Sequence, residues 1–319
     1  MSGAPDAVVV GIDVGGTKVL AVEVDSQGEV LRTARRETPG RLVDVRLVED
    51  ALTEALGDIA GGRPVAAVGL AAAGFVDREG ERVRFAPHLP WRDDSVRGRL
   101  ADRWGTTVAL DNDANCVARA EAAYGAAQGV SSALVITLGT GIGGALLLDG
   151  VVVRGHHGMA GEFGHMQVVP DGQLCECGRR GCWEQYSSGN ALVRLARAEV
   201  GRMPTILDEL CGGDPDRLTG PMVSEAAEEG DLLARQAFGS VGDWLGVGVA
   251  NLVAAFDPEL VVVGGGVSAA GDRLLEPARA ALGRSLVGAG HRDVPPIVRA
   301  RFGPEAGAVG AADLARSLL

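Results

Sequence analysis

The sequence predicts an α/β protein made of two similar units, and three observations lead to that prediction. The chain has 319 residues, more than a single hydrophobic core usually organises. The order strand, glycine turn, strand, hairpin and strand occurs twice, at residues 7–36 and at residues 132–154. The 48 glycines, about twice the average usage of roughly 7%, concentrate where predicted strands end. We therefore expect a duplicated fold with two facing glycine turns that approach a ligand.

The first half of the chain alternates predicted strands and helices. Residues 42–60 repeat apolar side chains at helical spacing, and residues 114–127 are rich in alanine, so both segments are predicted helices. A further helix is expected to close at residues 100–104. Strands are expected at residues 7–13, 17–24, 29–36, 64–70 and 107–110.

The second half repeats this organisation. Asp149 and Gly150 form a strong hairpin signal between two short predicted strands. Strands are expected at residues 132–138, 145–148, 151–154 and 260–263, and helices at residues 189–199, 232–256, 272–282 and 308–319.

Composition and charge exclude several classes of protein. Hydrophobic residues make up 46% and charged residues 23% of the chain, as in an ordinary globular protein. With 30 Lys and Arg against 42 Asp and Glu, the net charge is −12, so we expect no binding to nucleic acid or to anionic membranes. Residues 1–6 lack the features of a signal peptide, and no stretch approaches the roughly 20 apolar residues of a membrane span. We expect a cytosolic protein.

The first glycine turn, residues 13–18 (Asp-Val-Gly-Gly-Thr-Lys), joins two predicted strands. Its glycines allow backbone N–H groups to turn towards phosphate oxygens, and Thr17 and Lys18 can add donors. Asp13, at the strand end, is placed to hold Mg²⁺ through water. The segment is not a P-loop, because the required spacing is absent and no helix follows. A plain tight hairpin is the alternative.

The second glycine turn, residues 139–144, matches Gly-x-Gly-x-x-Gly, which is the dinucleotide-binding fingerprint. That fingerprint requires a helix after the turn, whereas a predicted strand and a hairpin follow here. Glu162 lies near the expected acidic position but in a glycine-rich segment. We therefore reject a dinucleotide site and interpret the segment as a second phosphate turn.

Asp113 lies where a predicted strand ends and a predicted helix begins. Its carboxylate suits a base that accepts the proton of an attacking hydroxyl, with Asn112 holding a neighbouring hydroxyl. A carboxylate with a pKa of about 4 is a weak base, but it suffices for phosphoryl transfer, which depends mainly on positioning. The alternative is that Asp113 only caps the helix.

Cys175, Cys177 and Cys182 lie close together with glycines between them, and His165 lies shortly before. This set suits a tetrahedral zinc knuckle, which is structural because full ligation leaves no open position. It would anchor a loop carrying Glu162, His165 and Glu184, side chains that can bond sugar hydroxyls. The alternative is a cluster of free thiols, since the chain's five cysteines argue against a disulfide framework.

Residues 261–267 (Val-Val-Val-Gly-Gly-Gly-Val) predict a buried strand and a glycine bend before a helix. A nucleoside can lie against such a bend. A simple strand-to-helix turn is the alternative.

Taken together, these motifs resemble the ROK family of sugar kinases, and within it the zinc-containing glucokinases, over essentially the whole chain. The most specific part is residues 161–165 (Gly-Glu-Phe-Gly-His) followed by residues 175–184, and residues 13–18, 112–115 and 138–144 match the rest in order. The resemblance implies an actin-like ATPase fold with two ribonuclease-H-like lobes, a cleft between them and a small zinc knuckle. It implies a small lobe of residues 1–113 plus the C-terminal helix 305–319, and a large lobe of residues 114–304 with the knuckle at 165–182.

The resemblance also implies a role for each matching residue. Asp113 would be the catalytic base, and His165 would bind both zinc and sugar. The sugar-binding residues would be Gly74, Asn112, Asp113, Glu162, His165 and Glu184. The MgATP-binding residues would be Asp13, Gly15, Gly16, Thr17, Lys18, Gly139, Thr140, Gly141, Gly265 and Gly266, and the zinc ligands would be His165, Cys175, Cys177 and Cys182.

The expected activity is therefore that of a glucokinase using MgATP, and relatives are commonly homodimers or homotetramers. One departure concerns the sugar: His88 stands where relatives usually carry Asn, in a loop near the sugar pocket. Another hexose (mannose, fructose or an N-acetylated aminosugar) is thus an alternative substrate, and polyphosphate an alternative donor. A sugar-sensing regulator of the same family is disfavoured, because the phosphate-binding strand begins by Val8 and leaves no room for a preceding DNA-binding helix-turn-helix.

Overall fold

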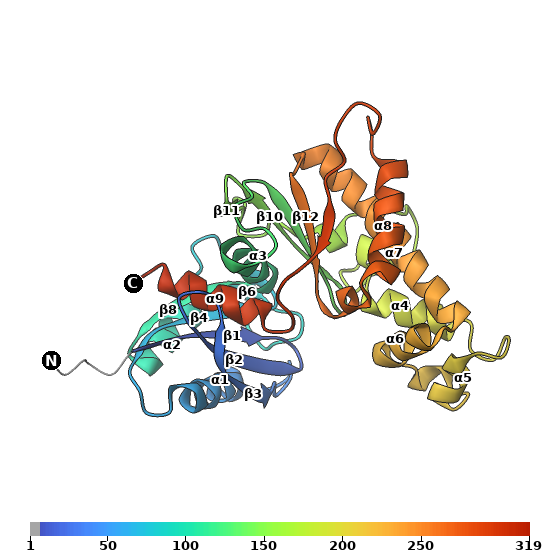
Figure 1. Ribbon diagram of the computed structural model, residues 1–319. Coiled ribbons are helices and arrows are strands. Elements are labelled where there is room, and N and C mark those ends of the chain that lie inside the picture. The colour runs from blue at the N-terminus through green and yellow to red at the C-terminus, as the bar shows by residue number, and fades with distance from the viewer. Residues whose placement is uncertain (1–6) are drawn as a thin grey trace. The chain divides into compact units, whose positions relative to one another are not determined.

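The computed structural model describes residues 7–319, so the expectation about a signal peptide at residues 1–6 lies outside the described part of the chain. The chain divides into two compact units (Figure 1). Unit 1 runs to Ser131 and also contains Ala145–Gly161 and Arg301–Leu319, and unit 2 contains Ser132–Gly144 and Glu162–Ala300.

Unit 1 is built on a five-stranded sheet with the order β3-β2-β1-β4-β8. β1 pairs antiparallel with β2 across the first glycine turn and parallel with β4, which pairs parallel with β8. The carboxyl ends of β1, β4 and β8 therefore lie at one edge of the sheet. At this edge Asp13 pairs with Ala71, and Ala71 pairs with Asp111. The strands are β1 (Val8–Val14), β2 (Lys18–Val24), β3 (Val30–Glu37), β4 (Val65–Ala72) and β8 (Thr107–Asn112).

Helices cover both faces of this sheet. On one face α1 (Val45–Ala60) and α2 (Val96–Trp104) pack their apolar side chains, among them Leu52 and Leu100, against Ile12 of β1. On the other face α9 (Ala306–Arg316) packs with α3 (Asp113–Tyr124), and Figure 1 shows the red C-terminal helix beside the blue N-terminal strands.

Small residues let α9 approach its neighbours closely. A Cβ at Gly11 of β1 would lie 1.8 Å from the carbonyl oxygen of Ala308, and one at Gly310 would lie 1.7 Å from that of Cys116 in α3. Arg119 of α3 also pairs with Asp313 of α9 at 2.6 Å. These contacts keep α3 within unit 1, so the observed division differs from the expected boundary after residue 113.

A small three-stranded sheet in unit 1 had no counterpart in the sequence prediction. Its strands are β5 (Phe75–Val76), β6 (Val83–Phe85) and β7 (Arg92–Asp94), in that order. Strands of two or three residues are too short to show an alternating pattern. Gly74, with a φ of 149°, precedes this sheet, and a Cβ there would lie 2.5 Å from the carbonyl oxygen of Phe85.

The second sheet repeats the arrangement of the first. Its order is β11-β10-β9-β12-β13, so the first strand is again central, with the hairpin on one side and two parallel strands on the other. This repetition confirms the duplicated α/β fold. The strands are β9 (Ala133–Leu138), β10 (Ile142–Leu148), β11 (Val151–Val152), β12 (Leu260–Gly264) and β13 (Ile297–Arg299).

Unit 2 carries most of its helices after the knuckle. Glycines let α7 and α8 pack closely, because a Cβ at Gly246 would lie 2.2 Å from the carbonyl oxygen of Ala278. The helices are α4 (Gly189–Arg197), α5 (Ile206–Cys211), α6 (Gly220–Glu229), α7 (Leu232–Phe256) and α8 (Asp272–Ser285), with 3₁₀ turns at Phe163–His165, Trp183–Gln185, Pro215–Arg217 and Gly266–Ala270.

α7 bears on the sequence-based expectation that no segment is apolar enough to span a membrane. Among the described residues it is the one helix long and apolar enough to cross a membrane by length and composition. However, 61% of its most apolar window is buried inside the protein. Phe238, Leu245 and Val249 are among its buried side chains. α7 is thus packed as the core helix of unit 2.

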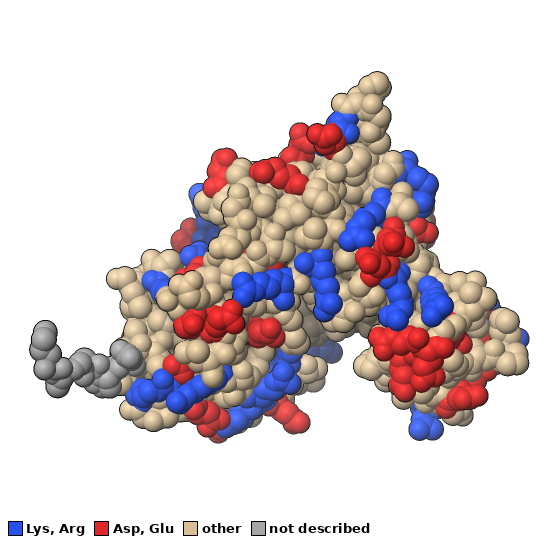
Figure 2. Space-filling view, viewed as in Figure 1, with Lys and Arg blue, Asp and Glu red and all other residues tan. Residues whose placement is uncertain are grey.

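Acidic side chains gather on one part of unit 2. Figure 2 shows them over the region that Figure 1 labels α5 and α6, where Glu209, Glu225, Glu228 and Glu229 are exposed. A surface of this charge repels polyanions.

Candidate active site and metal centre

The carboxyl edge of the unit 1 sheet brings together the acidic residues predicted from the sequence. Asp13 lies near the end of β1, Asn112 ends β8, and Asp113 begins α3. Asp113 is close enough for its negative charge to act on Asp13. The structure therefore places the predicted base beside the predicted magnesium-binding carboxylate.

Asn112, and not Asp113, is the N-cap residue of α3. The Asn112 side-chain oxygen accepts hydrogen bonds from the backbone N–H groups of Ala114 (2.9 Å) and Asn115 (3.2 Å). Its Nδ2 donates to the carbonyl oxygen of Gly74 at 3.0 Å, so Gly74 lies at the same edge. Asp113 accepts a hydrogen bond from the backbone N–H of Ala114 at 2.9 Å. Asn112 thus takes the capping role offered as the alternative function of Asp113.

The surroundings make both carboxylates more basic. Burial raises the pKa of Asp113, because the charged form loses hydration, although hydrogen bonds from Ala114 oppose that shift. Burial and then the charge of Asp113 raise the pKa of Asp13 to about 7, while Lys18 opposes this. Two neighbouring carboxylates of this kind favour the binding of a proton or a cation.

The first glycine turn has features of a tight hairpin and of a phosphate-binding turn. The N–H of Gly15 donates to the carbonyl oxygen of Lys18 at 3.0 Å, as in a tight hairpin. Thr17 and Lys18 are exposed. A Cβ at Gly16 would lie 2.5 Å from the Cβ of His88, so the loop with the unusual histidine packs directly against this turn.

Asp111 and Arg154 form an ion pair beside this site, and the sequence prediction assigned neither a role. Arg154 Nη2 lies 2.6 Å from Asp111 Oδ2, and the residue Asp111 is only 7% exposed. The available signal was a charged residue directly after the predicted strand at residues 107–110 and directly before Asn112.

In unit 2, two glycine turns follow the parallel strands β9 and β12. Gly139 and Thr140 are exposed, and their carbonyl oxygens accept hydrogen bonds from Gly189 (2.8 Å) and Asn190 (3.3 Å). β10 follows this turn, which agrees with the rejection of a dinucleotide fingerprint.

The glycine bend after β12 lies at the same edge of the second sheet. Gly265 has a φ of 80°, and a Cβ there would lie 2.4 Å from the carbonyl oxygen of Leu138 at the end of β9. Both Gly265 and Gly266 are exposed. The predicted phosphate turn and the predicted nucleoside bend of unit 2 are therefore neighbours.

The predicted metal ligands gather in unit 2. One ligand atom from each of His165, Cys175, Cys177 and Cys182 lies within 4.8 Å of all the others. The Sγ atoms of Cys177 and Cys182 are 3.6 Å apart, and Cys175 Sγ lies 3.7 Å from His165 Nδ1. A tetrahedral zinc site with bonds of about 2.3 Å has ligand separations of about 3.8 Å. The donor set and its dimensions fit a zinc ion.

Burial and hydrogen bonds set the pKa values of these thiols. Burial raises the pKa values of Cys175 and Cys182, because it removes water from the charged form. A bound divalent cation would reverse that effect by stabilising thiolates.

The remaining predicted sugar-binding residues surround His165. Its Nδ1 lies 3.6 Å from Glu184 Oε1, and its Nε2 lies 3.9 Å from Glu162 Oε2. The Cys175 thiol donates to Glu184 at 3.1 Å. A Cβ at Gly141 would lie 2.4 Å from Glu184 Oε2, so this carboxylate also lies against the second glycine turn.

The core of unit 2 anchors the knuckle through Trp183. This side chain is fully buried, and its Nε1 donates to the carbonyl oxygen of Trp244 at 2.7 Å. A Cβ at Gly248 of α7 would lie 2.0 Å from the indole ring. The predicted knuckle is thus anchored to α7 by Trp183, the residue directly before Glu184.

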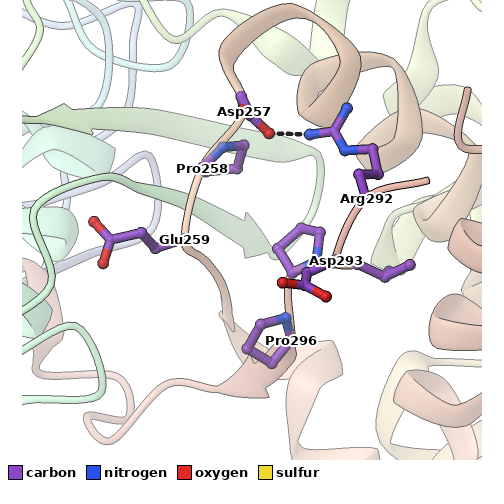
Figure 3. A pocket seen from close by; sticks show the side chains of 8 residues that line it. Asp257, Pro258, Glu259, Arg292, Asp293 and Pro296 are labelled. Atoms are coloured by element: carbon purple, nitrogen blue, oxygen red, sulfur yellow. Dashed lines mark hydrogen bonds and ion pairs between the residues drawn. The ribbon is translucent and has the colours of Figure 1, made fainter. Parts of the chain in front are cut away.

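A cavity of about 360 Å³ in unit 2 lies away from all of these residues. It is formed between the end of α7 and the loop before β13, where Figure 3 shows the ion pair of Asp257 and Arg292. Because none of the predicted site residues lines this cavity, we assign it no role in the site.

Comparison with known proteins gives matches over both units. A family model described as the ROK family matches residues 9–317. A glucokinase of Streptomyces coelicolor is 42% identical over 310 residues, which are 96% of this chain and 97% of that protein. A glucokinase of Thermotoga maritima is 34% identical over 279 residues, which are 86% of this chain and 87% of that protein.

A solved structure shares the fold. It is a ROK family glucokinase from Streptomyces griseus in complex with glucose and AMPPNP, with a TM-score of 0.90 and 42% identity over 98% of this chain and 100% of that chain.

Proposed function

This chain belongs to the ROK family, and we propose that it is a glucokinase that transfers the γ-phosphate of MgATP to the 6-hydroxyl of glucose, giving glucose 6-phosphate. The observation that carries the proposal is the position of Asp113. Its carboxylate begins α3 at the carboxyl edge of the unit 1 sheet, has a raised pKa, and is relieved of the capping role by Asn112. The full-length similarity to glucokinases supports the assignment of the substrates.

Asp113 acts as the base in this proposal. It accepts the proton of the 6-hydroxyl as the oxygen attacks the γ-phosphorus and the bond to the β-phosphate oxygen breaks. Burial raises the pKa of this carboxylate, and a higher pKa makes it a stronger base for the hydroxyl proton. Because the transition state is loose, holding the hydroxyl in line contributes most of the effect.

In this proposal the sugar hydroxyls would be bound by two groups of residues. Asn112 and the backbone of Gly74 would act from unit 1, and Glu162, His165 and Glu184 from unit 2. The hydrogen bond from Asn112 to Gly74 supports their joint role. The positions of Glu162 and Glu184 beside the His165 ring support a joint role of these three residues in binding the sugar.

Zinc, held by His165, Cys175, Cys177 and Cys182, would supply structural order and no chemistry of its own. With Nδ1 as the metal ligand, the His165 ring keeps its proton on Nε2, which can then donate to a sugar hydroxyl. The short distance from Nδ1 to Cys175 supports this choice of nitrogen.

The nucleotide would lie along the glycine turns. Gly15, Gly16, Thr17 and Lys18 of unit 1 and Gly139, Thr140 and Gly141 of unit 2 would contact its phosphates, and Gly265 and Gly266 its adenosine. Mg²⁺ bound with ATP would offset phosphate charge, and Asp13 would hold it through water. The raised pKa of Asp13 supports this role, because a carboxylate crowded by Asp113 gains from a nearby cation.

Another hexose remains the second candidate substrate because of His88. This side chain packs against Gly16 in the first glycine turn, where it can alter the space available to the substrates. We further propose a cytoplasmic homodimer or homotetramer, which analytical ultracentrifugation would test.

A coupled assay of the purified protein across a panel of hexoses tests this function. ATP and polyphosphate would each serve as the donor. We expect the highest kcat/KM for glucose with ATP. A higher value for another hexose or for polyphosphate would change the substrate assignment, and no turnover with any sugar would refute kinase activity.

A further inference from the structure

We propose that Arg154 is a positioning residue for phosphoryl transfer: through Asp111 it holds the junction of β8 and α3, which presents Asn112 and Asp113. The proposal rests on the proposed function, because it concerns the same reaction. The hydrogen bonds that carry it all lie within unit 1, and none requires Arg154 to touch a substrate.

Arg154 binds two structural elements with one guanidinium group. Its Nε and Nη2 donate to Oδ2 of Asp111 at 3.0 and 2.6 Å, and its Nη1 donates to the carbonyl oxygen of Arg78 at 2.9 Å. Asp111 is only 7% exposed. Because a buried carboxylate is costly unless it is paired, the guanidinium of Arg154 compensates the charge of Asp111 at this place.

The second oxygen of Asp111 organises the start of α3. Asp111 Oδ1 accepts hydrogen bonds from the backbone N–H of Asn112 at 2.8 Å and from Nδ2 of Asn115 at 3.0 Å. One carboxylate therefore connects the last residue of β8 to the first turn of α3. Its orientation fixes the direction in which the chain leaves the strand and enters the helix.

This junction carries both groups that act on the sugar in the proposed mechanism. Asn112 caps α3 and bonds to Gly74, and Asp113 follows it directly. Rotation of Asp111 would move both side chains together. Since a displacement of about 1 Å can cost about 100-fold in rate, the pair between Arg154 and Asp111 controls the rate without contacting the substrates.

Arg119 of α3, the helix that begins at the β8–α3 junction, offers a matched control. Arg119 Nε donates to Asp313 Oδ2 at 2.6 Å, and the exposed fractions of these side chains are 34% and 18%, against 25% for Arg154 and 10% for Asp111. The Arg119 pair joins α3 to α9, away from the β8–α3 junction. Removing it tests the general effect of losing a partly buried ion pair.

Steady-state kinetics of Arg154→Met and Arg119→Met test the proposal. For Arg154→Met we expect kcat to fall by about 10- to 100-fold and the KM for glucose to rise, while the KM for MgATP stays within about twofold. For Arg119→Met we expect all three values within about twofold of wild type. A merely structural defect lowers the folded fraction, which reduces the apparent kcat and leaves both KM values unchanged.

The double variant Asp111→Asn/Arg154→Met separates positioning from the cost of a buried charge. It removes both charges, so the fold is no longer burdened by an unpaired carboxylate. We expect its thermal stability to recover relative to Arg154→Met while its kcat stays low. Recovery of kcat to the wild-type value would overturn the proposal, as would unchanged kinetics in Arg154→Met.

The test is independent of which hexose the enzyme prefers. If the wild-type protein phosphorylates another hexose, the same comparison of KM and kcat applies to that acceptor. The substrate assignment can therefore fail in the wild-type assay while the role of Arg154 is still confirmed or refuted.

Discussion

The carboxylate of Asp113 acts on that of Asp13 at the carboxyl edge of the unit 1 sheet. Two causes raise the pKa of Asp13 to about 7. The larger is burial, and the second is the negative charge of Asp113. The two side chains come from strand and helix ends 100 residues apart along the chain, and parallel pairing through β4 brings them together. This pairing of carboxylates has a measurable effect on stability.

Asp13 is expected to make the ligand-free protein less stable as the pH rises. The pKa of this carboxyl is about 7 in the folded protein against 3.8 as its ordinary value, so the folded state binds more protons between these pH values. The free energy of unfolding therefore falls as the pH rises through this window and levels off above it. Asp13→Asn removes this contribution.

Urea unfolding at pH 5 and pH 8 in the absence of Mg²⁺ and nucleotide measures the effect. The stability advantage of Asp13→Asn over wild type should be greater at pH 8, by at most about 3 kcal/mol, since pH 5 already lies inside this window. An advantage that is the same at both pH values would show that Asp13 titrates normally.

The knuckle is expected to hold one zinc ion per chain. Cys175→Ser removes a buried ligand, so zinc should be lost and the melting temperature should fall. Because Glu184 and His165 lose their support, the KM for glucose should rise. Cys211→Ser is the control, since this buried thiol lies in α5 outside the cluster. Metal analysis by mass spectrometry checks the prediction, and full zinc content in Cys175→Ser would contradict it.

Gly141→Ala is expected to weaken sugar binding with little loss of stability. The added Cβ would lie 2.4 Å from Glu184 Oε2, and a flexible carboxylate can move away more easily than backbone can. We expect the KM for glucose to rise about tenfold, as for the loss of one charge-assisted hydrogen bond.

The control for this variant is Gly239→Ala in α7, where a Cβ meets nothing within 4 Å. It should leave the KM for glucose unchanged and raise stability by about 0.5–1 kcal/mol, because Ala is favoured over Gly in a helix. An unchanged KM in Gly141→Ala would show that the position of Glu184 does not matter for the sugar.

Most of the fold could be predicted because its elements have regular patterns. The apolar period identified α1, and the two glycine turns identified the duplication that both sheets share. The cysteine spacing predicted the cluster of His165, Cys175, Cys177 and Cys182, since these residues lie close together in sequence. Each of these features is local, and local features can be read from a single chain.

The features that could not be predicted depend on contacts between distant residues. The ion pair of Asp111 and Arg154 joins positions 43 residues apart, and nothing near either residue in the sequence identifies its partner. The placement of α3 in unit 1 depends on Gly310 approaching the carbonyl oxygen of Cys116. The strands β5, β6 and β7 were missed because they are too short for a periodic pattern.

The central claim is that Asp113 is the base for transfer to the sugar, and the turnover of Asp113→Asn tests it most directly. The amide keeps the shape of the side chain and an oxygen that can accept from Ala114 N–H, but it cannot take up the proton. We expect kcat to fall by about 10²- to 10⁴-fold, while calorimetry shows a glucose Kd within about threefold of wild type. A kcat close to the wild-type value in this variant would contradict the account.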